Sequence, residues 1–241
     1  MKNVVIGVGE IGGPLLELIK EAGLDAQGVD IEPVKIEEPV DVMHICLPFK
    51  DKDAFVKTVV DYIKKYNPQL TIIESTVVPG ITRKIAESSG DAVVHSPVRG
   101  VHKKMKEELK FYTKYIGTDN AEWAEKAAKH YHEVGLKTII LDKPEKTEFI
   151  KLLSTSYYGL LIGWAQEVAR ICKENGLDYD EIMSYAKEIQ ERGLPRPIMR
   201  PEPIGGHCVV PNIKLLKKVI HSDYLNAVEK SNEWIRRANE N

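Results

Sequence analysis

The sequence has only three cysteines among its 241 residues, and Cys46, Cys172 and Cys208 lie far apart without CxxC spacing. An odd number of widely separated cysteines argues against a disulfide framework and against a zinc knuckle. An excess of positive charge is also absent, because 34 Lys and Arg face 36 Asp and Glu. No overall positive field would hold a polyanion, so we expect no nucleic-acid partner.

Long apolar runs are missing as well. Glycines interrupt the N-terminal segment MKNVVIGVGEIGG, and no later apolar stretch approaches the roughly 20 residues that a membrane-spanning helix requires. The composition, 43% hydrophobic and 29% charged, is that of a globular protein with a sizeable core. We therefore expect a cytoplasmic protein with no membrane partner.

The first part of the chain alternates short apolar runs with amphipathic stretches, as strands and helices alternate in a mostly parallel sheet. The expected strands are Asn3 to Gly7, Ala26 to Asp30, Val42 to Cys46, Thr71 to Glu74, Ala92 to His95, Tyr112 to Ile116 and Thr138 to Leu141. Apolar residues at three- and four-residue spacing predict helices over Pro14 to Ala22, Lys52 to Lys65, Gly80 to Ser88 and Ala121 to Glu133.

From Pro144 onward the pattern changes, and no strand is expected. Helices are predicted over Lys146 to Asn175, over Tyr179 to Glu191 and, as one or two elements, over Asn212 to Glu240, with a Pro- and Gly-rich loop at Arg192 to Pro211. The sequence thus predicts an α/β fold in two domains. A Rossmann-type, mostly parallel sheet spans residues 1–143, and an all-helical domain spans residues 144–241.

The strongest local signal is the turn Gly7-Val8-Gly9-Glu10-Ile11-Gly12, which follows a VVI strand and opens a helical pattern. Its glycines permit a tight turn and let pyrophosphate approach the backbone at the helix N-terminus. Asp30, at the end of the next strand, can accept hydrogen bonds from ribose hydroxyls and would repel a 2′-phosphate, which favours NAD over NADP. S-adenosylmethionine, whose ribose is held by a similar carboxylate, stays a competitor.

Several segments, in order, resemble the UDP-glucose/GDP-mannose dehydrogenase family. They are GVGEIGG, Asp41 to Pro48 (DVMHICLP), Glu74 to Gly80 (ESTVVPG), Ser96-Pro97, Lys146 to Asp178 and the GGHC loop at Gly205 to Cys208. The resemblance implies oxidation of a nucleotide sugar in two NAD-dependent steps, through a thiohemiacetal and a thioester on a cysteine. It assigns the cofactor contacts to Gly7, Gly9, Glu10, Ile11, Gly12, Asp30, Leu47, Pro48 and Ser75.

The same resemblance implies catalytic residues. It assigns the nucleophile to Cys208, where the alternative is that Cys208 is only a small buried hydrophobic residue. Lys151 would stabilise a developing alkoxide, where the alternative is a solvated helix lysine. Thr76 matches a threonine near the nicotinamide, and its alternative role is to cap the helix that follows Pro79. Gln166-Glu167 stands where the family has Asn-Glu, which we interpret as a structural match.

The chain departs from the family at its acids. The glutamate after Ser96-Pro97 is Val98, and the acid four positions later is His102, which could serve as a base or belong to a solvated loop with Arg99, Lys103 and Lys104. Thr155 replaces an asparagine, and Asn212 replaces an aspartate. These last two keep their hydrogen-bonding capacity, but Asn212 lacks the charge, which puts the full two-step oxidation in question.

The length of the chain, the apolar residues of its long helix and two clusters of His and Arg residues give further expectations. Family members continue into a further nucleotide-sugar-binding domain, so we expect a smaller substrate, or one held by a dimer mate or delivered by another protein. The resemblance implies a homodimer through the long helix, whose apolar surface would come from Tyr157, Tyr158, Leu160, Leu161 and Trp164; the alternative is that these residues face the Rossmann domain. His130 and His132 point to different helix faces, so no metal site is predicted. Arg192, Arg196 and Arg200 are either substrate ligands or solvated loop residues.

Three classes of function therefore stay open. The first, which we favour, is an NAD-dependent oxidoreductase acting on a sugar or hydroxy acid through Cys208 and Lys151. The second is a Rossmann enzyme of other chemistry, such as a methyltransferase. The third is a non-catalytic nucleotide-binding homologue.

Overall fold

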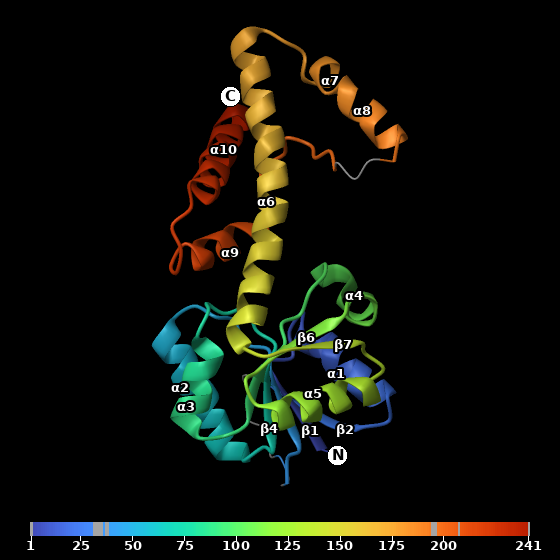
Figure 1. Ribbon diagram of the computed structural model, residues 1–241, viewed down its shortest axis with the longest axis vertical. Coiled ribbons are helices and arrows are strands. Elements are labelled where there is room, and N and C mark those ends of the chain that lie inside the picture. Colours follow the sequence, from blue (N-terminus) through green and yellow to red (C-terminus); the bar gives the residue numbers. More distant parts are fainter. Residues whose placement is uncertain (1, 31–35, 37–38, 194–196, 207, 241) are drawn as a thin grey trace. The chain divides into compact units, whose positions relative to one another are not determined.

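The computed structural model describes every residue except 1, 31–35, 37–38, 194–196, 207 and 241 (Figure 1). The chain divides into two compact units, Met1–Lys151 and Leu152–Asn241. None of the helices within the described ranges is both long and apolar enough to cross a membrane. The functional roles predicted for the two domains stay predictions.

The first unit is built on a seven-stranded sheet in the order β2-β1-β3-β4-β5-β6-β7. Its strands are β1 (Lys2–Ile6), β2 (Asp25–Val29), β3 (Val42–Ile45), β4 (Leu70–Ile73), β5 (Val93–His95), β6 (Lys114–Gly117) and β7 (Thr138–Leu141). All neighbouring strands are parallel except β5 and β6, which are antiparallel. The predicted Rossmann-type, mostly parallel sheet is therefore confirmed.

Five α-helices and a short 3₁₀ helix surround this sheet in the described residues. They are α1 (Gly12–Glu21), α2 (Lys52–Tyr66), α3 (Ile81–Ser89), the 3₁₀ helix η1 (His102–Lys104), α4 (Met105–Phe111) and α5 (Ala121–Glu133). One buried core joins α1, α4 and α5 to the sheet, and α2 and α3 pack against each other (Figure 1). Helix α4 was not predicted from the sequence, because this short helix buries only Met105 and Leu109.

In the described residues of the second unit all regular secondary structure is helical, as predicted. It contains most of α6 (Pro144–Asn175), with α7 (Tyr179–Ile182), α8 (Ser184–Glu191), α9 (Val209–Leu216) and α10 (Asp223–Glu240). Pro144 starts α6, at a position where the missing N–H of proline costs nothing. Figure 1 shows α10 alongside α6.

Two predicted boundaries in this unit were wrong. The helix expected over residues 179–191 is divided at Met183, whose ψ of 1° is not helical. The loop expected over residues 192–211 ends at Cys208, because α9 begins at Val209 and has Pro211 in its first turn, where proline is tolerated. Cys208 therefore lies at the start of a helix.

Candidate active site

The glycine-rich turn follows β1 and leads into α1, as predicted. Gly7 has a φ of 87°, and a Cβ there would lie 2.8 Å from the Cys46 carbonyl oxygen. A Cβ on Gly12 would lie 1.9 Å from the Gly7 carbonyl oxygen. Contacts within the fold therefore require glycine at both positions. At Gly9, by contrast, a Cβ would meet no atom within 4 Å, so this backbone borders open space.

This turn lies where the strand order reverses, since β1 has β2 on one side and β3 on the other. Ligands of open α/β sheets bind at such a switch point, beyond the carboxyl ends of the strands. Asp30 follows β2, and its Oδ2 accepts a hydrogen bond from the Val8 backbone N–H at 3.1 Å. The carboxylate predicted to bind ribose is thus attached to the glycine-rich turn and exposed to solvent.

The predicted residues of the next two strands lie at the same edge of the sheet. The Ser75 hydroxyl lies 3.1 Å from the Ile45 carbonyl oxygen and 2.6 Å from that of Leu47. This hydroxyl connects Ser75, the second residue after β4, to the end of β3. Leu47 is half-buried and Pro48 is exposed, so both can border a ligand at the switch point.

The loop after β5 reaches back to the glycine-rich turn. His102 Nδ1 lies 2.6 Å from Glu10 Oε2, and the His102 side chain is 28% exposed. The Arg99 guanidinium stands 4.7 Å from the ring centre of Tyr112 and 5.3 Å from that of Tyr115. These two residues therefore make specific contacts, while Lys103 and Lys104 are exposed, and both alternatives for this loop stay predictions. Val98 is buried in the core, with no polar atom in its side chain for proton transfer.

Beneath this edge lies a buried ionic cluster that the sequence analysis did not predict. Glu74, directly after β4, accepts hydrogen bonds from Tyr131 at 2.7 Å, from Lys114 at 2.6 Å and from His44 at 3.0 Å. Burial alone would raise the pKa of Glu74, but the charges and hydrogen bonds of Lys114 and His44 lower it to about 2. Glu74 is therefore an ionised structural carboxylate.

The His44 ring faces a second histidine. His44 Nε2 lies 2.9 Å from His130 Nε2, and both side chains are buried. Burial, followed by the influence of His44, lowers the pKa of His130 to about 3, so this ring is neutral at physiological pH. No group of three or more potential metal ligands comes together within the described ranges.

The first turns of α6 pack at the end of β5 inside the first unit. Thr147 Oγ1 lies 2.7 Å from His95 Nδ1, and His95 Nε2 lies 3.2 Å from the Ser75 carbonyl oxygen. Burial is the main cause that lowers the pKa of His95 to about 3, and the charges of Lys114 and, to a smaller extent, Lys151 add to it. Lys151 follows Thr147 by one helical turn, which places it on the same face of α6.

Glu148, on the same part of α6, caps the N-terminus of α3. This is the role that the sequence offered as the alternative for Thr76. The Glu148 carboxylate accepts hydrogen bonds from the backbone N–H groups of Gly80 and Thr82, at 2.6 and 2.9 Å, and from the Thr82 hydroxyl at 2.7 Å. The N-cap of α3 is Gly80, which has no capping side chain. Capping of α3 by Thr76 was therefore a wrong alternative, and Thr76 is a half-buried residue of the loop between β4 and α3.

In the second unit, the GGHC loop leads directly into α9. Cys208 is the N-cap residue of this helix, and its carbonyl oxygen accepts a hydrogen bond from the Asn212 backbone N–H at 3.0 Å. The Asn212 side-chain amide donates to Thr155 Oγ1 at 3.2 Å. Three residues assigned separately from the sequence thus lie together, while His207 falls outside the described residues.

The three cysteines differ in their surroundings. Cys208 and Cys46 are both half-buried, whereas Cys172 is 3% exposed. Burial raises the pKa of the Cys46 thiol well above its ordinary range. Of the three, Cys208 has the environment that best permits reaction with a substrate.

A cavity of 390 Å³ borders the GGHC loop. Its walls include Ile204 and Gly205 from one side of Cys208 and Val209 from the other, together with Tyr158, Ile162, Met199, Arg200, Glu202 and Pro203. Arg200 Nη1 forms an exposed ion pair with Asp180 Oδ1 at 3.0 Å. Arg192 is exposed, and Arg196 falls outside the described residues.

A family model and two curated proteins show what this chain is similar to. Residues 145–239 match the model of the UDP-glucose/GDP-mannose dehydrogenase family, central domain. A UDP-N-acetyl-D-mannosamine dehydrogenase of Methanococcus maripaludis is 26% identical over 96% of this chain and 65% of its own length. One from Methanocaldococcus jannaschii is 28% identical over 85% of this chain and 58% of its own length. The chain thus spans about two thirds of the first of these relatives.

Solved structures show the same fold at low identity. The UDP-D-ManNAc dehydrogenase of Pyrococcus horikoshii superimposes with a TM-score of 0.84 and 21% identity, over all of this chain and 70% of that one. A 3-hydroxyisobutyrate dehydrogenase of Mycobacterium tuberculosis gives a TM-score of 0.74 and 15% identity, over 97% and 93% of the two chains. The chain is therefore similar to the UDP-glucose/GDP-mannose dehydrogenase family, whose central-domain model matches residues 145–239.

Proposed function

We propose that the chain takes part in the NAD-dependent oxidation of a sugar nucleotide, with Cys208 as the nucleophile. The observation that carries this proposal is the grouping of Cys208, Thr155 and Asn212 at the start of α9, beside a cavity of 390 Å³. Curated UDP-N-acetyl-D-mannosamine dehydrogenases that align with 96% of the chain support the substrate class.

The glycine-rich turn fits NAD on structural grounds. Open space above Gly9 leaves room for pyrophosphate, and Asp30 is fixed by Val8 where it can accept hydrogen bonds from ribose hydroxyls. Bound NAD would accept the hydride that leaves the sugar carbon. Gly7 and Gly12 shape the turn, and Leu47, Pro48 and Ser75 border it at the neighbouring strand ends.

The chain's own residues would then handle the sugar. Lys151 would stabilise the alkoxide that forms as the alcohol loses its proton. The Cys208 thiol would add to the resulting aldehyde carbon and give a thiohemiacetal, whose oxidation by a second NAD leaves a thioester. Water then cleaves the thioester, which releases the carboxylate and restores the thiol. Thr155 and Asn212 would supply neutral hydrogen bonds beside the sulfur.

Cofactor choice is tested first by calorimetric titration with NAD, NADP and S-adenosylmethionine. We expect NAD to bind preferentially and Asp30→Ala to weaken it by roughly 10- to 100-fold, the effect of losing hydrogen bonds to a charged group. Asp25→Ala, an exposed change at the other end of β2, is the matched control. Binding of S-adenosylmethionine alone would overturn the dehydrogenase proposal in favour of methyl transfer.

The chemistry is tested by NADH formation with UDP-linked amino sugars. Cys208→Ser should abolish carboxylate formation, and Cys172→Ala, a change at a buried site in α6, should leave it intact. Two NADH molecules per sugar are expected from the full sequence of steps. A single NADH per sugar, unchanged in Cys208→Ser, would remove the thioester from the proposal.

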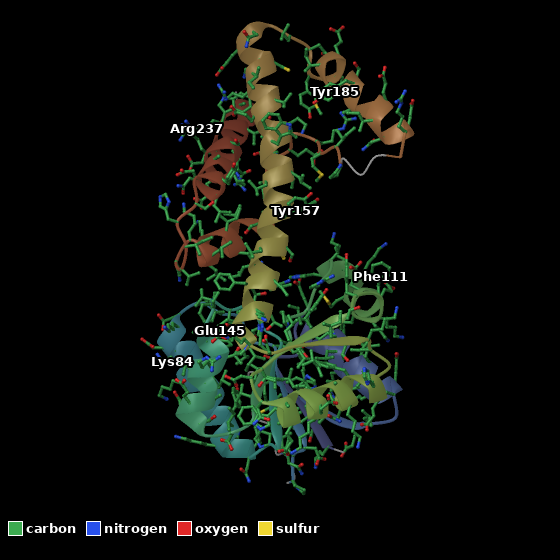
Figure 2. The ribbon with its side chains drawn as sticks, in the orientation of Figure 1. Lys84, Phe111, Glu145, Tyr157, Tyr185 and Arg237 are labelled. Carbon is green, nitrogen blue, oxygen red and sulfur yellow. The ribbon has the colours of Figure 1, made fainter. Side chains whose placement is uncertain are left out.

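We also propose that α6 mediates a homodimer. Leu153, Tyr157, Trp164 and Ile171 recur at spacings of four, seven and seven residues, and are 49%, 59%, 61% and 41% exposed. Figure 2 shows the Tyr157 ring projecting from α6. Sedimentation should show a dimer that Tyr157→Glu dissociates, and a monomer at high protein concentration would contradict it.

A further inference from the structure

The chain just before the GGHC loop is held by one buried side chain of α10. Asn232 Oδ1 accepts a hydrogen bond from the Ile204 backbone N–H at 2.6 Å, and Asn232 Nδ2 donates to the Ile204 carbonyl oxygen at 3.3 Å. A single side-chain amide therefore pairs with both backbone polar groups of Ile204. Both residues are buried, with 7% of Asn232 and 3% of Ile204 exposed.

Two further side chains extend this arrangement across two helices. Gln166 of α6 is fully buried, and its Nε2 donates to the Glu202 carbonyl oxygen at 2.7 Å and to Asn232 Oδ1 at 3.3 Å. Arg236 of α10 donates from Nη2 to the Ile204 carbonyl oxygen at 2.8 Å. We call Gln166, Asn232 and Arg236 the amide clamp.

Packing alone does not explain polar groups in this place. Burying an amide is unfavourable unless hydrogen bonds replace those it makes with water, and an apolar side chain of similar size avoids that cost. Here the side-chain amides of Gln166 and Asn232 form hydrogen bonds with backbone groups of residues 202–204 as well as with each other. The clamp therefore specifies the path of this segment in a way that leucine side chains could not.

The segment that the clamp fixes leads directly to the thiol. Gly205 and Gly206 are exposed, and Gly206 has a φ of 76°, so these glycines provide little anchoring of their own. Cys208 follows Ile204 by four residues and starts α9. Cys208 thus lies between the clamped residues 202–204 and the start of α9 in the sequence. Ile204 and Gly205 also form part of the wall of the 390 Å³ cavity.

We propose that Gln166, Asn232 and Arg236 are positioning residues that set the place of the Cys208 thiol relative to the neighbouring cavity. The inference rests on the proposed role of Cys208 as nucleophile. A nucleophile misplaced by about 1 Å can lose on the order of 100-fold in rate. The clamp therefore acts on the covalent step and leaves the cofactor site of the first unit unchanged.

The test is a graded series in the full chain. Asn232→Leu removes three of the hydrogen bonds described above, Gln166→Met removes two and Arg236→Met removes one. Asn226→Leu, an exposed change on α10, is the control. We expect kcat to fall by about 10- to 100-fold in Asn232→Leu, less in the other two, with the affinity for NAD unchanged.

A second readout is independent of turnover. The rate of Cys208 alkylation by iodoacetamide, followed against pH and assigned by peptide mass spectrometry, should change in the same order across the series. Wild-type kcat and a wild-type alkylation profile in folded Asn232→Leu would overturn the proposal. If Asn232→Leu does not fold, the same wild-type result in both Gln166→Met and Arg236→Met overturns it.

Failure of the proposed function gives a different pattern. In that case Cys208→Ser keeps its activity, while alkylation of Cys208 still reports whether the clamp fixes the thiol. Loss of activity in Cys208→Ser, together with an unaffected clamp series, would contradict the positioning role alone.

Discussion

The two units of this chain bury different kinds of polar groups. The first buries full charges, since Glu74 and Lys114 form an ion pair of 2.6 Å whose side chains are at most 3% exposed. Among the described residues of the second unit, the buried polar side chains are neutral amides and hydroxyls: Ser156, Gln166, Asn212, Ser231 and Asn232. Buried charges make stability depend on pH, whereas neutral amides fix geometry without titrating.

The contrast predicts that acid destabilises the first unit selectively, and this is the largest effect that we expect. Burial holds the pKa of His95 and of His130 at about 3, against an ordinary value of 6.5. Between these values the unfolded chain binds protons that the folded unit does not, so stability falls as pH falls. The slope is about 1.4 kcal/mol per pH unit for each histidine. Glu74 acts in the same direction between 4.5 and about 2.

Urea unfolding followed by tryptophan fluorescence separates the two units. Trp123 reports on the first unit in a Trp164→Phe/Trp234→Phe background, and Trp123→Phe leaves only reporters in the second. The first transition should shift strongly between pH 7 and pH 4, and the second much less. Equal shifts would show that the units unfold together, which would break the comparison.

Removing one partner of the buried pair should be the next largest effect. Lys114→Met leaves Glu74 buried beside an apolar side chain and should cost about 3–5 kcal/mol, as measured by urea unfolding at neutral pH. Adding Glu74→Gln should recover much of that loss, because the double variant no longer buries an unpaired charge. A double variant less stable than Lys114→Met would mean that the pair is itself strongly stabilising.

A smaller effect is expected where a carboxylate caps a helix. Glu148→Gln removes the negative charge at the N-terminus of α3 and one of the acceptor oxygens, so it should cost about 1–2 kcal/mol. Urea unfolding reported by Trp123 measures this loss. Glu87→Gln, an exposed change on α3, should cost almost nothing; a similar loss in both variants would contradict the cap.

The smallest effects on stability are expected from the side chains that cap single helices, and one such cap in each unit can be compared. Asn120 accepts a hydrogen bond from the Trp123 N–H at the start of α5, and Asp178 accepts one from the Glu181 N–H at the start of α7. Asn120→Ala should cost about 1 kcal/mol. Asp178→Ala should cost less, because α7 has four residues and none of them is buried. Thermal unfolding of the two variants side by side would check this order.

Local patterns predicted most of the fold. Parallel buried strands are short apolar runs, so all seven strands were found to within about two residues, and β7 was found without error. The antiparallel direction of β6 depends on α4 and the loop before it. That loop contains Gly100, which has a φ of 124° and whose missing Cβ leaves space for the Glu108 side chain, and neither feature has a periodic signature.

Candidate site residues could be named where the signal was local in sequence, and their roles stay predictions. The glycine-rich turn and Asp30 follow from a motif, and Cys208, Thr155 and Asn212 followed from family resemblance. The Glu74–Lys114 pair joins residues 40 positions apart, and the His44–His130 contact spans 86. Gln166 was noted only as a family match and Asn232 was missed, since no spacing rule links two residues 66 apart.

The cap of α3 also has a consequence for the order in which the chain acquires structure during synthesis. Gly80 and Thr82 receive their hydrogen-bond acceptor from a residue 66 to 68 positions later. On the ribosome, the sheet up to β5 can therefore emerge before the start of α3 is satisfied. The closure of this long loop must wait for the first turns of α6, which makes it a late event of high contact order.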